Sequence, residues 1–123
     1  MEIKKVICES KNEYTIVNEH WENSNAWGHR SVLLRNGREI ARNKVRYYNR
    51  TWEKYEYQTC MYGVVEKLLD NSKKDYIRAF KEDNDISRLT QARKDEALKN
   101  WSEDEFVKDL LEIRERIRER KFD

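Results

Sequence analysis

Proline is absent from this chain of 123 residues, and glycine occurs only three times. Proline-rich recognition segments and flexible glycine-rich linkers are therefore excluded. No apolar run approaches the roughly 18 residues that a membrane-spanning helix needs, and the opening segment MEIKKVICES lacks the apolar core of a signal peptide. We expect a single cytoplasmic domain over residues 1–123, with a sheet and a helix in residues 1–70 and a helical part in residues 71–123.

Cysteine and histidine are also scarce. Cys8 and Cys60 are far apart in the sequence, and thiols stay reduced in the cytoplasm, so we expect both to be small buried hydrophobic residues. The only histidines, His20 and His29, flank the segment WENSNAWG. A zinc site takes four ligands, and these two histidines with the few nearby carboxylates are too few, so we predict no metal site.

Catalytic motifs are missing too. The sequence has no glycine-rich phosphate loop and no G-x-S-x-G, H-E-x-x-H or C-x-x-C motif. Acidic residues are plentiful, but none stands in an apolar context that would raise the pKa of its carboxyl group. We therefore predict a protein that is not an enzyme and that has no cofactor.

Charge and aromatic rings are what the chain has in abundance. Charged residues make up 41% of it and aromatic residues 11%, while the formal net charge is only +2. The charges are unevenly placed: residues 29–54 hold eight basic and two acidic residues (+6), and residues 82–112 hold five basic and ten acidic residues (−5). This composition indicates a folded protein in which the hairpin and the segment after it are basic and the helical half is mostly acidic.

The first half of the sequence has the pattern of β-strands. Residues 3–8 and 13–21 are rich in β-branched and aromatic residues, and SVLLRNGREIARNKVRYY contains two such runs separated by Asn36 and Gly37. Asn-Gly favours a two-residue type I′ turn, because both positions need a positive φ. The cross-strand pairs predicted from this turn are Leu33 with Ile40, Val32 with Ala41, and Arg35 with Arg38.

The second half has helical periodicity. We expect a helix over residues 51–69 with Gly63 in close contact with the sheet, a second helix beginning at Ser72, and a third over residues 86–100. The run EDND should separate the second helix from the third. The expected fold is α+β: a small antiparallel meander with an Asn-Gly hairpin, packed on a helix and followed by a C-terminal helical part.

A last helix is predicted after the capping box of Ser102 and Glu105. Its apolar residues recur at spacings of four, three and four, which is typical of a seam against another helix. The same seam would serve a homodimer. Its residues are Phe106, Leu110, Ile113 and Ile117.

The segment RYYNRTWEKYEYQT, residues 46–59, crowds aromatic rings among cations. Alternation along a strand places Val45 and Tyr47 on one face, and Arg46 and Tyr48 on the other. Such a strip suits a protein interface, single-stranded nucleic acid, or a solvated face with no partner. The candidate partner-binding residues are Trp21, Trp27, Arg35, Arg38, Arg42, Lys44, Arg46, Tyr48, Arg50 and Lys54. A second contact surface is predicted at the acidic residues Asp83, Asp85, Asp95 and Glu96.

The run VRYYNRTWEKYEYQTCM resembles a strand-to-helix segment of small phage and mobile-element proteins of Gram-positive bacteria, over residues 37–69. These proteins include anti-CRISPR proteins, most of which are small, highly charged and non-enzymatic. The resemblance implies a protein that acts in the cytoplasm of a host bacterium and inhibits a CRISPR-type defence nuclease by stoichiometric binding. The alternative is a small nucleic-acid-binding regulatory protein of a phage.

Overall fold

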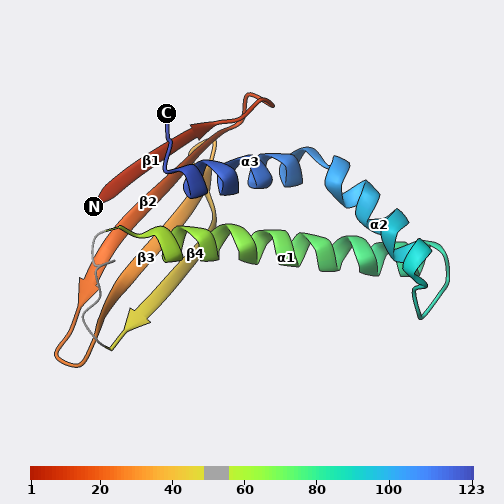
Figure 1. Cartoon of the computed structure of the whole chain (residues 1–123), viewed down its shortest axis with the longest axis horizontal. Helices are drawn as coiled ribbons and strands as arrows, with labels where there is room; N and C mark the ends of the chain where they lie inside the picture. Colours follow the sequence, from red (N-terminus) through yellow and green to blue (C-terminus); the bar gives the residue numbers. More distant parts are fainter. Residues whose placement is uncertain (49–55) are drawn as a thin grey trace.

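The chain forms one antiparallel sheet with helices against it, as shown by a computed structural model that describes residues 1–48 and 56–123 (Figure 1). The strands are β1 (Glu2–Ile7), β2 (Glu13–Glu22), β3 (Trp27–Arg35) and β4 (Arg38–Tyr47), and the helices are α1 (Gln58–Asp83), α2 (Gln91–Glu103) and α3 (Glu105–Glu119). The spatial order of the strands is β1-β2-β3-β4. The expected α+β fold with an antiparallel meander is thus confirmed.

The β3–β4 hairpin has the predicted two-residue turn. Asn36 and Gly37 have φ values of 50° and 85°, and Arg35 pairs with Arg38. The register further along the hairpin differs from the expected one. A bulge at Ile40 shifts the ladder, so the observed pairs are Leu33 with Ala41 and Val32 with Arg42.

Helix α1 differs from its predicted bounds at both ends. It begins at Gln58, after Tyr57 in a left-handed conformation with φ 59°, whereas the expected start at Thr51 lies outside the described residues. It then continues through Ser72 to Asp83, so the helix predicted to begin at Ser72 is the second half of α1. Neither glycine nor proline occurs between residues 64 and 83, and the helix therefore has nothing to end it before the predicted EDND break.

The caps of α2 and α3 also differ from the expected ones. Helix α2 begins after Thr90, whose side chain accepts a hydrogen bond from the Arg93 backbone amide at 3.3 Å, so Ile86 and Leu89 precede the helix. Helix α3 is capped by Asp104, which accepts from the Val107 amide at 3.1 Å. Ser102 lies in the last turn of α2 instead.

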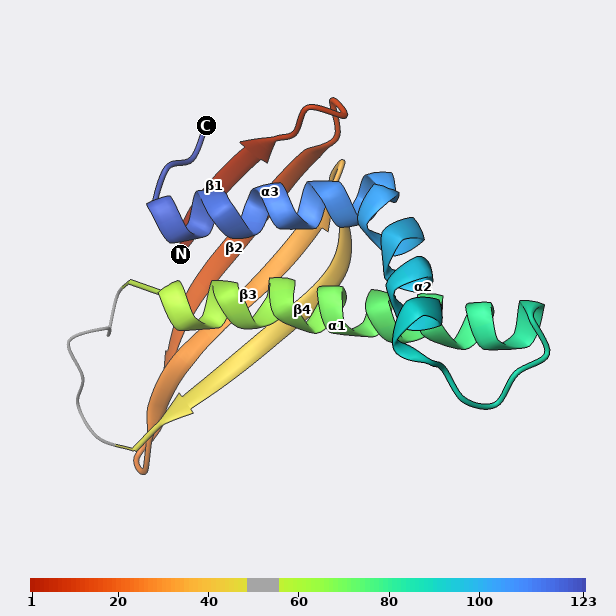
Figure 2. The ribbon, with the colours of Figure 1, turned by 45° about the vertical axis from the view of Figure 1, so that its right-hand side comes forward.

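Helices α1 and α3 pack on the same face of the sheet (Figure 2). The core contains alternate residues of the strands together with one stripe from each of these helices. Its buried members are Val6, Cys8, Tyr14, Ile16, Leu33, Tyr57, Met61, Val64, Val65, Leu69, Val107, Leu110, Ile113 and Ile117. Leu110, Ile113 and Ile117 are fully buried within the chain, so the seam expected to serve a homodimer is used inside the fold, and only Phe106 is half-buried.

The C-terminal residue lies along the outer edge of β1. The Asp123 amide donates to the Lys5 carbonyl at 2.9 Å, and the Ile7 amide donates to the Asp123 carboxylate at 2.7 Å. Arg116 also pairs with Asp123, at 2.9 Å. Among the helices that the structure describes, none combines the length and the apolar character that crossing a membrane requires.

Candidate interaction surface

One face of the sheet packs on α1 and α3, and none of the helices within residues 1–48 and 56–123 lies on the other face (Figures 1 and 2). We call this second side the open face. Because side chains alternate along a strand and paired residues share a face, the cross-strand pairs identify its members. They are Ile3, Lys5, Ile7, Glu13, Thr15, Val17, Glu19, Trp21, Gly28, Arg30, Val32, Leu34, Glu39, Arg42, Lys44 and Arg46. Tyr48 continues the β4 alternation just beyond the strand.

Aliphatic side chains form a row across three strands of the open face. Ile3 pairs with Val17, and Val17 pairs with Val32, so the three lie side by side. Ile3 is 53% exposed and Ile7 is 52% exposed, which makes them two of the most exposed large hydrophobic residues of the described chain. Val17 and Val32 are half-buried, so the row is most exposed at Ile3 on the outer strand. Aliphatic side chains grouped at a surface are typical of a contact with another molecule.

The charges of the open face are largely paired with one another. Lys5 lies 3.4 Å from Glu13, Arg30 lies 3.5 Å from Glu19, and Arg42 lies 2.5 Å from Glu39. The five cations of this face thus have three carboxylates beside them. The local excess of positive charge comes from the two remaining cations, Lys44 and Arg46.

Lys44 and Arg46 lie against aromatic rings. The Lys44 ammonium is 4.5 Å from the centre of the Trp21 ring, and the Arg46 guanidinium is 5.4 Å from the centre of the Tyr48 ring. Tyr48 is 74% exposed. The exposed edge of β4 therefore presents both positive charge and an aromatic surface.

Gly28 of β3 leaves space for the Trp21 ring. A Cβ atom on Gly28 would lie 2.5 Å from Cζ2 of Trp21 and 2.0 Å from the Val45 carbonyl oxygen, closer than any real Cβ contact. The absence of a side chain at this position lets the indole approach β3 closely, with Lys44 over its ring.

The structure assigns the predicted partner-binding residues to different places. Trp21, Arg42, Lys44, Arg46 and Tyr48 lie together along the open face, as the alternation of β4 predicts. Arg38 is exposed beside the turn. Arg50 and Lys54 lie outside the described residues.

Trp27 and Arg35 face the helical side of the sheet. Trp27 is only 7% exposed, and its ring stacks on Tyr47 with centres 4.6 Å apart. The Arg35 guanidinium lies 5.4 Å from the centre of the Phe106 ring of α3. Neither side chain belongs to the surface that Trp21 and Lys44 form, although both were predicted to bind with them.

The aliphatic row was missed by the sequence analysis, although a signal for it is present. Ile16 and Val17 are adjacent in β2, and Val32, Leu33 and Leu34 are adjacent in β3. Consecutive apolar residues in a strand place apolar side chains on both faces of the sheet. Because the helices cover only one face, the second set is left at the surface.

The predicted acidic contact residues lie at the far end of the helical part. Asp83 ends α1, Asp85 lies in the α1–α2 loop, and Asp95 and Glu96 lie on α2. All four are exposed, and Asp95 accepts a hydrogen bond from Gln91 at 2.8 Å. They are distant from the sheet (Figure 1).

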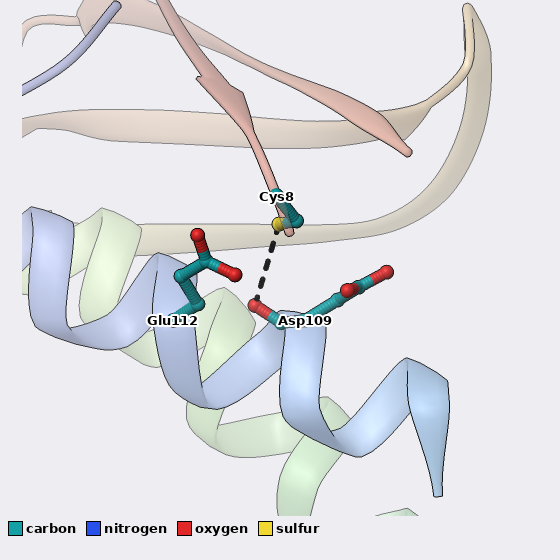
Figure 3. A group of neighbouring side chains, drawn as sticks. All are labelled: Cys8, Asp109 and Glu112. Carbon is teal, nitrogen blue, oxygen red and sulfur yellow. Dashed lines mark hydrogen bonds between the residues drawn. The ribbon is translucent and has the colours of Figure 1, made fainter. Parts of the chain in front are cut away.

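A cluster of possible metal ligands lies where the end of β1 meets α3 (Figure 3). One ligand atom each from Cys8, Asp109 and Glu112 lies within 4.8 Å of the others. They adjoin an open hollow of about 720 Å³ whose lining is mostly acidic. The lining residues are Glu9, Ser10, Glu103, Glu105, Lys108, Asp109 and Glu112.

The hydrogen bonds of this cluster indicate a structural role. The buried Asp109 carboxylate accepts from Ser10 Oγ at 2.8 Å, from Asn12 Nδ2 at 3.0 Å and from the Tyr14 hydroxyl at 2.8 Å. These bonds occupy both carboxylate oxygens that a metal would need, and they tie the β1–β2 turn to α3.

The Cys8 thiol is poorly suited to chemistry in this position. Burial, followed by the nearby negative charges of Asp109 and Glu112, raises its pKa to about 12. A thiol with this pKa is protonated at neutral pH, whereas a nucleophile or metal ligand must be a thiolate. The cluster therefore supplies no nucleophile.

Among the surfaces described, the open face is the strongest candidate for function. It combines an aliphatic row with two cation–aromatic pairs, and its strands are held rigidly by the core on their other side. Comparisons of the chain with protein-family models, with curated proteins and with solved structures found no match.

Proposed function

We propose that this protein is a non-catalytic binding protein whose open face docks on another protein. The observation that carries the proposal is the aliphatic row made by the exposed Ile3 and the half-buried Val17 and Val32, flanked at the β4 edge by Lys44 over Trp21 and by Arg46 over Tyr48. Protein interfaces have this composition: an apolar centre, aromatic rings and arginine, and a polar rim.

The composition of the open face favours a protein partner over nucleic acid. Sheets that bind single strands place aromatic rings at the centre, where bases stack. Here the central row is aliphatic, and three of the five cations are paired with carboxylates. A phosphate backbone would gain little from cations that are already neutralised.

A second candidate function, direct binding of nucleic acid, is favoured by one feature. Arg46 and the exposed Tyr48 ring lie together at the end of β4, and a base could stack on such a ring while a phosphate meets the cation. Binding of this kind weakens steeply as the salt concentration rises, which distinguishes it from an interface with an apolar centre.

The partner to test first is a CRISPR-type defence nuclease of a host bacterium, as the resemblance over residues 37–69 implies. In this proposal the protein acts in the host cytoplasm and inhibits the nuclease by occupying one of its surfaces. The inhibition is stoichiometric, since one molecule is needed for each nuclease molecule and nothing is turned over.

The proposal is tested by titrating the protein into cleavage reactions of purified CRISPR nucleases and by plasmid interference in bacteria. The informative variant is Ile3→Ser/Lys44→Glu/Arg46→Glu, which removes one aliphatic side chain and reverses two charges on the open face. The matched control is Ala79→Ser/Lys67→Glu/Lys74→Glu, which makes similar changes at exposed positions of α1. We expect the wild-type protein to inhibit at a 1:1 ratio. The first variant should need at least about tenfold more protein for the same inhibition, and the control should inhibit like the wild type.

Two results would overturn the proposal. The first is that no nuclease of the panel is inhibited and that none is retained in a pull-down from a nuclease-treated bacterial lysate. The second is that labelled single-stranded or duplex DNA binds at low salt, and that the open-face variant alone abolishes this binding. That second result would establish the nucleic-acid alternative.

A further inference from the structure

A second surface feature lies far from the sheet, where the end of α1 meets the start of α2 (Figure 1). The two helices and the loop between them line an open hollow of about 440 Å³, within the range of small ligand sites. Its lining residues are Ile77, Lys81, Ser87, Arg88, Leu89 and Lys94.

The charge of this hollow is of one sign. Lys81, Arg88 and Lys94 come from α1, the loop and α2 respectively, and among the described residues no carboxylate lines the hollow with them. Within the part of the chain that the structure describes, none of the three forms an ion pair. Glu82 and Asp85 line a neighbouring hollow, which shares Lys81 and Ser87 with this one.

The start of α2 adds to the positive potential. Its first turn has no acidic residue, and Arg93 occupies a position where a carboxylate would normally offset the helix dipole. Like charges that lie close together repel one another. A bound anion would reduce this repulsion and so lower the electrostatic energy of the site. The hollow is thus electrostatically complementary to a negatively charged group.

The lining of the hollow also includes two aliphatic residues. Ile77 and Leu89 are half-buried there, and neither belongs to the core cluster between the helices and the sheet. Contact with an apolar group would remove their exposed apolar surface from water, which is energetically favourable. An occupant that suits both features has an apolar side chain next to negative charges.

We propose that this hollow binds an acidic peptide segment of a partner protein, with one apolar side chain on Ile77 and Leu89 and with carboxylates on Lys81, Arg88 and Lys94. A nucleic acid fits less well, because none of the described residues that line the hollow has an aromatic ring on which a base could stack. The inference is independent of the open face, since the two surfaces share no residue.

The test is fluorescence anisotropy with the full-length protein and the fluorescein-labelled peptide Asp-Glu-Leu-Phe-Asp-Glu. Two comparison peptides separate the contributions: Asn-Gln-Leu-Phe-Asn-Gln lacks the charges, and Asp-Glu-Ser-Ser-Asp-Glu lacks the apolar side chains. We expect the first peptide to bind at least about tenfold more tightly than either comparison peptide, because both parts of the hollow contribute.

Variants of the protein locate the binding. Lys81→Glu/Arg88→Glu/Lys94→Glu should weaken binding by more than about tenfold. The control Lys67→Glu/Lys74→Glu/Lys99→Glu changes the net charge equally at exposed positions of the same two helices and should leave binding within about twofold. Leu89→Ser should weaken binding by several-fold, and circular dichroism confirms that each variant is folded.

The proposal fails if the acidic peptide does not bind at low salt, or if the control triple variant weakens binding as much as the hollow variant. It also fails if the peptide does not bind but a labelled oligonucleotide does, and if the binding of the oligonucleotide depends on Lys81, Arg88 and Lys94. The open-face variant should bind the peptide normally, so failure here leaves the proposed function untouched.

Discussion

Burial of single ionisable side chains gives the protein a defined response to alkaline pH. The pKa of the Cys8 thiol is raised from 9.0 to about 12, and burial is the largest cause. Burial also raises the pKa of the Cys60 thiol. In the folded chain these thiols keep their protons at a pH where the thiols of the unfolded chain have lost them. Rising pH therefore favours the unfolded chain, and the stability that is fully present below pH 8 is lost progressively above about pH 9.

We expect Cys8→Ala to make the free energy of unfolding less sensitive to pH. The wild-type protein should lose about 1.4 kcal/mol through Cys8 between pH 8 and pH 10, and the variant should not show this part of the loss. Urea denaturation at a series of pH values measures it. Cys60→Ala is the comparison variant, since it should remove the separate contribution of the second thiol. A wild-type free energy that stays constant up to pH 10 would contradict the expectation.

The placement of single residues was predictable from sequence where alternation is clear. In β4, apolar and charged residues alternate, and Arg46 and Tyr48 were correctly separated from Val45 and Tyr47. In β3 the run of Val32, Leu33 and Leu34 is apolar on both faces, so the sequence carried no signal for the face of Arg35. Its pairing with the buried Tyr14 and its contact with Phe106, both distant in the sequence, place it on the helical side.

The contact between α1 and β4 depends on a glycine, as the sequence predicts. A Cβ on Gly63 would lie 2.2 Å from Nδ2 of Asn43, and that amide donates to the Cys60 carbonyl at 3.2 Å. The Cys60 thiol donates in turn to the Asn43 carbonyl at 3.4 Å. The missing side chain at Gly63 makes room for the Asn43 amide between helix and strand.

A double-mutant cycle at Gly63 and Asn43 tests this contact. Gly63→Ala in the wild-type protein should lower the free energy of unfolding by about 1 to 2 kcal/mol, because the new methyl group displaces the Asn43 side chain. In an Asn43→Ala background the same substitution should stabilise by up to about 1 kcal/mol, which is the usual preference of a helix for alanine over glycine. Chemical denaturation of the four proteins gives the coupling energy.

The sign of the change in the free energy of unfolding caused by Gly63→Ala shows which group limits the space at this position. If Gly63→Ala stabilises both backgrounds, the glycine is not needed for close packing, and its contact with Asn43 is incidental. If it destabilises both equally, the obstacle is another part of the sheet. Only a change of sign between the two backgrounds places the obstacle at the Asn43 side chain.

Element types were predicted better than element ends. The four strands, the Asn-Gly turn and the last helix all follow from local pattern. The ends failed where two signals of similar strength compete: Ser72 has the pattern of a cap but lies within α1, and Ser102 was preferred over Asp104, which makes the actual cap. Local sequence cannot settle such choices, because packing of α1 and α3 against the sheet contributes more than one capping bond.

At the scale of the whole molecule, the two proposed surfaces differ in their mechanical support. The open face belongs to a sheet that packs on the core with its other side. The hollow lined by Lys81, Arg88 and Lys94, here called the basic hollow, lies on the part of α1 and α2 that projects beyond the sheet (Figure 2). All of α1 lies within the described residues, and its buried members are Cys60, Met61, Val64, Val65 and Leu69, all in its first half. In α2 only Ala97 is buried. Stability should therefore decrease along α1 from the sheet outward.

Native-state hydrogen exchange tests this gradient. Amides of residues 64–69 should exchange only through global unfolding, while those of residues 76–83 should open locally, with protection lower by at least about 100-fold. Tyr76→Phe removes the hydroxyl that donates to Asp104 at 2.6 Å, and it should lower the protection of the outer half further without affecting residues 64–69. Equal protection along the whole helix would instead show that α1, α2 and the sheet unfold as one unit. In that case a ligand in the basic hollow would stabilise the open face as well, and the two surfaces could not act independently.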